Sequence, residues 1–589
     1  MADLASQPTS VQSVYSWFRE EKLFVNRRYQ RKLVWTLEEK QKLIDSIVKK
    51  YPIPAILIAE REDAPGTYEI IDGLQRLHAI VSYIETTFPT ADGKRFNLNF
   101  FPTAKSKADE GLFIPFEDGD YISQREVSAL LDYNIALSVM RGATETEVND
   151  VFDRINTYGH RLSDQERRQA GVQNEFSNMV RTIACTLRGD ESADVLPLRM
   201  MPSISIDLPK SKHGYDVQAD EVFWVVHGIL RSTDLRDSMD EQCIADIAAC
   251  IVRGVLVDRS KDALDEIYLK GSAESDRVNT ALGVYGAEKF ADEFKFCVDE
   301  ILKVCRANSN DKLRDLVFDR KTTNAFPSVF AALLIAFHEL IVRDGQIIAN
   351  YECVKKSISN ISSRIEQGRR ATSPDERRKN IDIVKGLIND CFIAATEKPR
   401  IYDNHSTTDI DSAIRRSEVE LANYELKQGL LTLHDDRSID PNVVSKVVKT
   451  VCAIANNGPQ RVGKIIIGVT DKDSDAERIH ALDGVDPRKV GKRQVVGVNR
   501  EAKALKITVE SYLGKWKDGI KNSGLSATLR DGVLSSIDFN SYFGLGVIVV
   551  TVPSQSELSY VDGEVYWRNG DSTELATAAK QIASLAKRF

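Results

Sequence analysis

The chain has 589 residues, 42% hydrophobic and 28% charged, which is the balance of a water-soluble globular protein. This length exceeds what one ordinary hydrophobic core organises, so we expect three or more domains. The net charge of −8 does not mark the whole chain as a nucleic-acid binder. Its apolar runs are shorter than the roughly 20 residues that cross a bilayer and no signal peptide is evident, so we expect a cytoplasmic protein without a membrane partner.

The first 170 residues show alternating strand and helix patterns. A capping box at Thr36–Glu39 predicts a helix start, and strands are predicted at 55–60 and 67–71. A helix follows from about 74 to 86, and another strand is predicted at 133–140. Two more capping boxes, Thr144–Glu147 and Ser163–Glu166, predict two further helices. We therefore expect an α/β domain over 1–170.

Beyond residue 170 the pattern changes twice. Long amphipathic stretches, for example at 221–230, 288–306 and 329–343, predict a helical region over 171–395 that packs on the first domain. A segment rich in turn-forming residues, 396–412, is the predicted linker. The last part, 413–589, is predicted to be α/β again, with strands at 425–433, 464–469 and 545–552, a helix at 442–456 and a closing helix at 573–588. The predicted fold class is thus α/β and α multidomain.

The cysteines give little sign of a metal site. All eight stand singly, with no C-x-x-C pair, and the eight histidines form no H-E-x-x-H motif. We expect the cysteines to be buried, reduced thiols rather than zinc ligands.

The turn at Asp72-Gly73 links a predicted strand directly to a predicted helix. Amide groups at a helix N-terminus carry partial positive charge and suit a phosphate. Gly73 lets the backbone approach an anion closely, Arg76 offers a guanidinium for phosphate oxygens, and Asp72 is suited to positioning a metal ion or water. Taken alone, the pattern more often marks an ordinary turn and helix cap.

Two other motifs narrow this interpretation. Tyr29-Gln30-Arg31 precedes the turn, and Phe152-x-x-Ile155-Asn156-x-x-Gly159-x-x-Leu162-Ser163-x-x-Glu166 follows it. In this order the three motifs resemble the ParB/sulfiredoxin-like domain of GmrSD-type restriction enzymes, a family marked by a D-G-Q-Q-R motif. The resemblance covers about 1–170 and implies a domain that binds and hydrolyses a nucleoside triphosphate (NTP).

The resemblance also implies the roles of single residues. It makes Asp72 a candidate catalytic residue and places these residues at the nucleotide: Gln30, Arg31, Asp72, Gly73, Gln75, Arg76 and Asn156. Leu74 departs from the family, because it stands where the first Gln is expected and cannot form a hydrogen bond; this bears on hydrolysis more than on binding. A surface ion pair for Arg31 and a helix C-cap for Asn156 remain open alternatives.

Acidic residues in the last part form a second constellation. Glu425 and Lys427 are two residues apart and would share a strand face, while Asp471 follows the predicted strand 464–469. If a helix ends near Asn423, Glu420 and Glu425 can turn toward one point. Carboxylates at strand ends bind Mg²⁺ or Mn²⁺, which activates water, and a lysine stabilises developing negative charge. Without further pattern, such acids are more often ordinary surface residues.

Three more segments extend this constellation. Glu420-x4-Glu425-x-Lys427 is followed by Ala453–Gly458, by Ile466–Asp471 and by Gly563–Thr573. Together they look like the AlbA-like domain of Schlafen proteins, over about 413–589. The resemblance implies a nuclease in which Glu420, Glu425 and Asp471 hold the metal and, with Lys427, form the catalytic set. Many relatives are known only as DNA-binding domains, so binding without cleavage stays open.

Basic residues in the last part suggest where nucleic acid binds. Where the Schlafen family has a compact Gly-Gly turn, this chain has the longer loop 457–463, and a basic run lies between 488 and 521. Such a run is more often a solvated face, but it can also hold a phosphate backbone. The predicted nucleic-acid contacts are Arg461, Lys464, Arg488, Lys489, Lys492, Arg493 and Arg568, with a structural ion pair as the alternative for Arg568.

The pairing of the two resemblances leads to one main hypothesis. We expect a bacterial anti-phage or restriction-type effector that couples NTP binding or hydrolysis to metal-dependent cleavage of DNA or RNA. The alternatives are a non-cleaving nucleic-acid-binding regulator and an NTPase that senses nucleic acid. The expected cofactors are Mg²⁺ or Mn²⁺ and an NTP, the expected partner is nucleic acid, and a homo-oligomer is left open.

Overall fold

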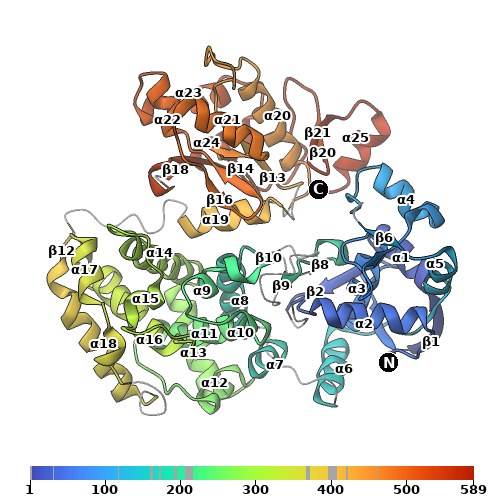
Figure 1. Ribbon diagram of the computed structural model, residues 1–589, viewed down its shortest axis with the longest axis horizontal. Coiled ribbons are helices and arrows are strands. Elements are labelled where there is room, and N and C mark those ends of the chain that lie inside the picture. Colours follow the sequence, from blue (N-terminus) through green and yellow to red (C-terminus); the bar gives the residue numbers. More distant parts are fainter. Residues whose placement is uncertain are drawn as a thin grey trace. The chain divides into compact units, whose positions relative to one another are not determined.

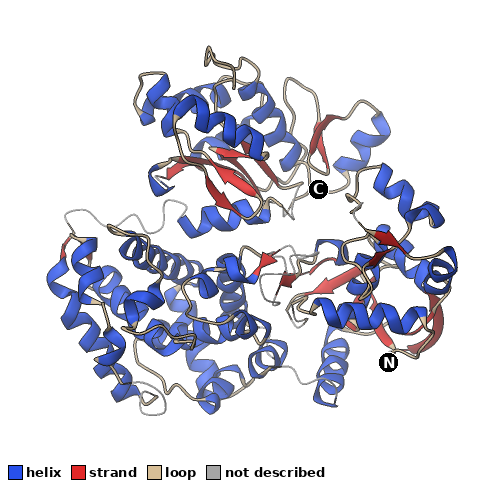
Figure 2. Ribbon diagram, in the orientation of Figure 1, coloured by secondary structure: helices blue, strands red, loops and turns tan. Residues whose placement is uncertain are grey.

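The computed structural model describes residues 3–28, 30, 32–116, 119–158, 163–171, 174–190, 195–205, 217–366, 372–395, 407–418, 422–459, 462–540 and 542–589. They form two compact units, Met1–Pro399 and Arg400–Phe589 (Figure 1). Strands lie in the first and last parts of the chain, and the middle is built mainly of helices (Figure 2). The predicted fold class is confirmed. None of the described helices has an apolar stretch long enough to cross a membrane.

A six-stranded mixed sheet organises the start of the first unit. Its strand order is β1 (Asp3–Ser10), β7 (Asn134–Arg141), β3 (Ile56–Glu60), β4 (Tyr68–Asp72), β2 (Leu23–Asn26) and β8 (Val195–Pro197). β7 and β3 pair in parallel, as do β4 and β2, and the other neighbours are antiparallel. The edge strand β8 comes from beyond residue 170, so the sheet extends past the predicted domain boundary.

The helices of this α/β part are α1 (Val11–Arg19), α2 (Leu37–Val48), α3 (Leu74–Ile84), α4 (Pro102–Asp109), α5 (Gln124–Leu131), α6 (Glu145–Tyr158) and α7 (Asp164–Gly171). Four of them, α2, α3, α6 and α7, begin where the sequence predicts, and α1, α4 and α5 were not predicted. In the Thr36 capping box, Thr36 Oγ1 accepts the Glu39 amide at 3.2 Å and Glu39 Oε2 accepts the Thr36 amide at 2.8 Å. The boxes at Thr144 and Ser163 form in the same reciprocal way. α2 and α3 bury their isoleucines against the sheet.

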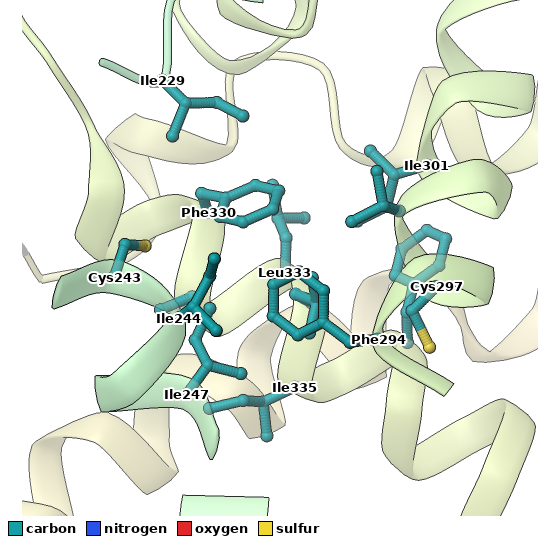
Figure 3. Packing of buried hydrophobic residues seen from close by; sticks show 14 of the residues in the cluster. Ile229, Cys243, Ile244, Ile247, Phe294, Cys297, Ile301, Phe330, Leu333 and Ile335 are labelled. Atoms are coloured by element: carbon teal, nitrogen blue, oxygen red, sulfur yellow. The ribbon is translucent and has the colours of Figure 1, made fainter. Parts of the chain in front are cut away.

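The helical body of the first unit is built around α16 (Pro327–His338). Figure 3 shows its Phe330 and Leu333 between α11 (Met239–Arg253) and α14 (Ala287–Arg306). The other longer helices are α8 (Glu175–Arg188), α12 (Lys261–Tyr268), α13 (Ala273–Tyr285), α17 (Tyr351–Ser357) and α18 (Pro374–Ile388). The helix predicted at 221–230 is only the short α9 (Phe223–Val226). It stops there because Gly228 adopts a left-handed φ of 71°, with Arg314 filling the space of a side chain.

One prediction about the cysteines was wrong. Cys353 in α17 and Cys391 form a disulfide, with their Cα atoms 5.7 Å apart. They are 38 residues apart in sequence, so only the tertiary packing of the helical body brings them together. The other six cysteines are free and buried, as predicted.

Buried charges join the α/β part to the helical body. We call this set the ion cluster; it contains Arg27, Lys32, Arg188, Asp190, Asp240 and Glu241. Arg27 binds both oxygens of Asp190, at 2.9 and 2.8 Å, and Lys32 Nζ lies 3.2 Å from Glu241. Arg188 pairs with Asp240 and lies 3.4 Å from Asp190. Burial alone would raise the pKa of Asp190, but Arg27 and Arg188 outweigh it and hold the pKa at about 2.

The second unit contains a four-stranded sheet covered on both faces. The order is β13 (Tyr424–Lys427), β14 (Gly463–Ile467), β19 (Val547–Val552) and β18 (Ile537–Asn540), with β13 and β14 parallel. One face packs on α20 (Val443–Ala455), α23 (Val509–Lys521) and α24 (Ala527–Ser535), and the other on α19 (Thr407–Arg416). Successive side chains of β14 point to opposite faces of the sheet. Ile465 and Ile467 therefore pack in the hydrophobic core on one face, and Ile466 packs in the core on the other.

Smaller elements complete the second unit. A three-stranded sheet consists of β15 (Val469–Thr470), β17 (Arg493–Val495) and β16 (Arg488–Val490), and β20 (Tyr566–Asn569) pairs with β21 (Ser572–Leu575). The remaining helices are α21 (Asp473–Asp483), α22 (Asn499–Ala504) and α25 (Ala579–Ala586). The closing helix predicted at 573–588 was therefore wrong in its first part, which is β21. Residues 396–406 of the predicted linker lie outside the described residues, and α19 begins at Thr407.

The strand predicted at 425–433 ends early, at Lys427. Gly429 has a φ of 152°, and a side chain there would meet the Glu501 carboxylate. The Glu501 carboxylate accepts hydrogen bonds from the backbone N–H groups of Leu430 and Leu431. These N–H groups are therefore not used to pair with a neighbouring strand. A tertiary contact thus replaces the local strand pattern.

The ion cluster yields a test of what holds the first unit together. We expect Asp190→Asn to lower the free energy of unfolding by about 3–5 kcal/mol, because it leaves Arg27 buried with a neutral partner. Because the folded pKa of about 2 lies below the ordinary value of 3.8, the wild-type contribution is fully present above pH 3.8. It is lost as the pH falls from 3.8 toward 2.

Denaturant unfolding followed across this pH range measures both effects. Asp63→Asn is the matched control, because Asp63 also pairs with an arginine, Arg61 at 2.6 Å, but its side chain is 69% exposed. Its loss should cost less than about 1 kcal/mol. Equal losses for the two variants would contradict a structural role for the ion cluster.

Candidate functional sites

A cleft of about 760 Å³ lies in the first unit at the ends of β4 and α3. Gln30 and Trp35 line one side, the turn from Asp72 to Arg76 lines the next, and Phe152, Ile155 and Glu166 come from α6 and α7. Arg236 and Asp237 of the helical body complete the wall. The structure thus brings parts of all three predicted motifs around one cavity.

The helix N-terminus at Gly73 has the form that the sequence predicts. Gly73 has a φ of 95°, and an added Cβ would lie 2.8 Å from Ile56 Cγ1, so only glycine fits. No side chain among the described residues caps α3, and residues 73–76 all line the cleft. This is an arrangement that favours an anion.

Two glutamine amides hold the segment before α2 in place. Gln75 is buried, and its Oε1 accepts the amides of Val34 and Trp35 at 3.1 and 3.2 Å while its Nε2 donates to Lys32 O at 2.6 Å. Gln30 Nε2 donates to the carbonyls of Ile70 and Ile71 at the end of β4. The geometry gives these amides the task of shaping the cleft, and direct contact with a nucleotide stays a prediction.

Arg76 and Asp72 differ in how open they are. Arg76 donates to the carbonyls of Pro54 and Ala55 and pairs with Asp72 at 2.8 Å. The Asp72 side chain is 42% exposed, whereas that of Arg76 is 12% exposed. Leu74 is buried against the hydrophobic core, which explains how the chain accommodates an apolar residue there.

Two predicted residues of this site, Arg31 and the side chain of Asn156, lie outside the described residues. The charged residues of the described wall are mixed in sign: Glu39, Asp72, Glu166 and Asp237 face Lys42, Arg76 and Arg236. The described wall by itself therefore has no excess of positive charge.

In the second unit, Glu425 is held between two cations at the end of β13. Lys427 Nζ lies 2.5 Å from Glu425 Oε1, and Arg568 Nη1 lies 2.9 Å from Oε2. Arg568 is 5% exposed and also donates to Tyr424 O and Thr573 Oγ1. Arg568 thus fastens the β20–β21 hairpin to β13, and the geometry favours positioning of Glu425 over the predicted phosphate contact.

Asp471 lies close enough to this pair to interact with it electrostatically. Burial raises the pKa of Asp471, Arg493 at 2.7 Å opposes the rise, and Glu425 reinforces it. Lys427 lowers this pKa and Asp571 raises it further. The structure therefore groups the predicted Glu425, Lys427 and Asp471 with Arg493 and with Asp571.

The other predicted residues of the second unit are spread out. Lys489 and Lys492 are exposed on the β16–β17 hairpin, and Lys464 is half-buried on β14. Arg488 instead lies 3.6 Å from the centre of the Phe543 ring, which makes it part of the packing against Phe543. Glu420 and Arg461 lie outside the described residues. Within the described ranges, no group of three acidic, histidine or cysteine side chains is arranged to hold a metal ion.

Comparison with known protein families shows what the two ends of the chain are similar to. Residues 14–172 match the model of the GmrSD restriction endonuclease N-terminal domain, and residues 420–577 match that of the Schlafen AlbA_2 domain. The chain joins these two domain families. The predicted fusion is confirmed. No curated protein and no solved structure gives a significant match.

The sequence did not reveal three contributors to these sites. Arg236 and Asp237 reach the cleft of the GmrSD-like part from the helical body, and nothing local marks them. Asp571 stands in the turn between β20 and β21 of the Schlafen-like part. Its place three residues after Arg568, within the segment 563–573 that resembles the Schlafen family, was the one available signal.

The cleft geometry separates two motif residues by their effect on stability. We expect Gln75→Ala to lower the free energy of unfolding by about 2–3 kcal/mol, because it leaves buried backbone groups without partners. Asp72→Ala should cost less than about 1 kcal/mol, since its ion pair is partly exposed. Gln41→Ala is the control: Gln41 makes one hydrogen bond to the backbone, to Pro89 O at 3.0 Å. Denaturant unfolding in which Gln75→Ala matched Gln41→Ala would refute the shaping role.

Proposed function

We propose that the chain is a restriction-type effector that acts on nucleic acid, with NTP binding in the GmrSD-like part licensing cleavage by the Schlafen-like part. The names of both matching families support a nucleic-acid-acting, restriction-type role. The observation that carries the nucleotide half is the convergence of three distant motifs on one cleft of about 760 Å³. Small-molecule sites typically measure about 300–1,000 Å³.

The polarity of the cleft suggests how the nucleotide lies in it. The phosphates belong at the N-terminus of α3, beside Gly73 and the Arg76 guanidinium. The exposed Asp72 carboxylate is the described group best placed to orient a water or a metal-bound phosphate. Because the described wall carries both signs of charge, we expect Mg²⁺ to accompany the NTP. Binding follows from this arrangement more directly than hydrolysis.

The cutting half of the proposal rests on Glu425, Lys427 and Asp471. Two carboxylates and a lysine at adjoining strand ends suit metal-dependent hydrolysis of a phosphodiester. A divalent cation bound there would supply an activated water, and Glu425 and Asp471 would be two of its oxygen ligands. The third proposed ligand is Glu420. The exposed Lys489 and Lys492 are the described cations best placed to meet the nucleic-acid backbone.

One observation favours a second function, nucleic-acid binding without cleavage. Both oxygens of Glu425 and one oxygen of Asp471 already pair with cationic side chains, so a metal would compete with Lys427, Arg568 and Arg493 for these carboxylates. A carboxylate that only orients such cations would serve a regulator. The same experiment decides between the two functions.

A cleavage screen with the full chain tests the proposal. Purified protein is incubated with DNA or RNA and Mg²⁺ or Mn²⁺, with and without each NTP. We expect NTP-dependent cutting, and Glu425→Gln and Asp471→Asn should slow it by about 100-fold, as the loss of groups at a metal site does. Asp531→Asn, which removes a 71% exposed acid on α24, should cut like wild type. Binding of nucleic acid without cutting under any condition would establish the regulator instead.

A further inference from the structure

Glu166 has one engaged and one unengaged carboxylate oxygen. Oε2 accepts the Ser163 amide at 2.9 Å, and the Glu166 amide donates to Ser163 Oγ at 3.1 Å, so the capping box of α7 fixes the side chain. Oε1 is buried and has no hydrogen-bond partner among the described residues, in a residue that is 9% exposed. A buried acceptor without a partner costs about 1–3 kcal/mol, so folded proteins rarely leave one without water or a ligand.

The position of Glu166 shows where that partner comes from. Glu166 and Gln30 line both the large cleft and an adjoining pocket of about 30 Å³, whose wall includes Arg27, Lys32 and Glu241 of the ion cluster. The small pocket has room for about one water. A larger molecule therefore reaches Glu166 from the cleft, on the side of α7.

The charge of Glu166 limits which part of a nucleotide can approach it. An ionised carboxylate only accepts hydrogen bonds, and it repels phosphate. The phosphates are proposed to lie at Gly73 and Arg76 on α3, a different helix of the cleft wall. The nucleoside end of the ligand, with its hydroxyl and ring N–H groups, is what remains to face α7.

We propose that Glu166 Oε1 accepts a hydrogen bond from an O–H or N–H group of the nucleoside bound in the cleft. The inference rests on the proposed nucleotide binding and adds to it a contact that sets orientation and selectivity. The group that Glu166 binds is an uncharged hydrogen-bond donor, which is either a hydroxyl of the ribose or an N–H group of the base. Glu166 is thus a binding residue of the cleft, beyond its role as a helix cap.

Glu166→Gln tests this contact without removing the cap. The amide oxygen can still accept from Ser163, while the –NH₂ group then stands where Oε1 stood and meets the ligand donor with another donor. Binding of ATP, GTP, CTP and UTP to the full chain is measured by isothermal titration calorimetry. For the NTP that binds tightest, we expect the variant to bind at least about tenfold more weakly, as for the loss of a hydrogen bond to a charged group.

Glu126→Gln is the matched control. Glu126 occupies the same capping-box position in α5, where its Oε2 accepts the Ser123 amide at 2.7 Å, and it does not line the cleft. We expect this variant to bind the NTP like wild type. Thermal unfolding of both variants shows whether they lose equal stability, so that a difference in affinity reports on the cleft.

Analogues then identify the donor. If the ribose supplies it, the 2′-deoxy or 3′-deoxy form of the preferred NTP should bind wild type about as weakly as the natural NTP binds Glu166→Gln. If the base supplies it, both deoxy forms should bind wild type normally, and the substitution should change the ranking of the four NTPs. Either pattern supports the inference and names the donating group.

Three outcomes would overturn it. Equal affinity of wild type and Glu166→Gln would mean that Oε1 holds only water. A loss of affinity that disappears when EDTA replaces Mg²⁺ would assign the carboxylate to the metal ion. Wild-type protein that binds none of the four NTPs would overturn the proposed nucleotide binding itself, and so differs from the first two results.

Discussion

Buried charges decide the architecture of the first unit. Arg27 and Lys32 of the α/β part pair with Asp190 and Glu241 of the helical body, and all four side chains are buried. Removing one member of such a set leaves its partners as uncompensated buried charges, which strongly destabilises the fold. The segment that carries Gln30 lies between these two anchors, and one wall of the cleft is therefore fixed from both ends. The shape of the cleft depends on the helical body as much as on the sheet.

This dependence divides the residues of the turn motif into two groups. Gln75 and Arg76 form most of their hydrogen bonds with backbone carbonyl and amide groups, so they build the cavity wall. Asp72 and the backbone at Gly73 are the open groups. In the second unit the same division applies, because the buried Arg568 holds Glu425 while Asp471 stays half-open to solvent. Residues of one motif can therefore differ in role, because some shape the site and others face its ligand.

Local signals explain which features were predictable. The three capping boxes, the strand at β4 and the glycine of the α3 turn are each set by a few neighbouring residues, and each forms as expected. The disulfide, the early end of β13 at Glu501 and the contribution of Arg236 to the cleft require residues distant in sequence. Glu166 shows the limit of local signals. Its spacing from Ser163 predicts the capping box but does not predict that its other oxygen, Oε1, is buried without a hydrogen-bond partner among the described residues.

The path of the chain into β8 has a further consequence. The chain leaves the six-stranded sheet, forms α8 in the helical body, and returns to supply the sheet's edge before continuing into the remaining helices. Severing it near residue 170 would expose the edge of β2 and remove the Asp190 that neutralises Arg27. The α/β part and the helical body are therefore interlaced, and recombination would have to transfer them together. The Schlafen-like unit, by contrast, follows them in sequence as a single continuous stretch, which one gene fusion suffices to join to the rest.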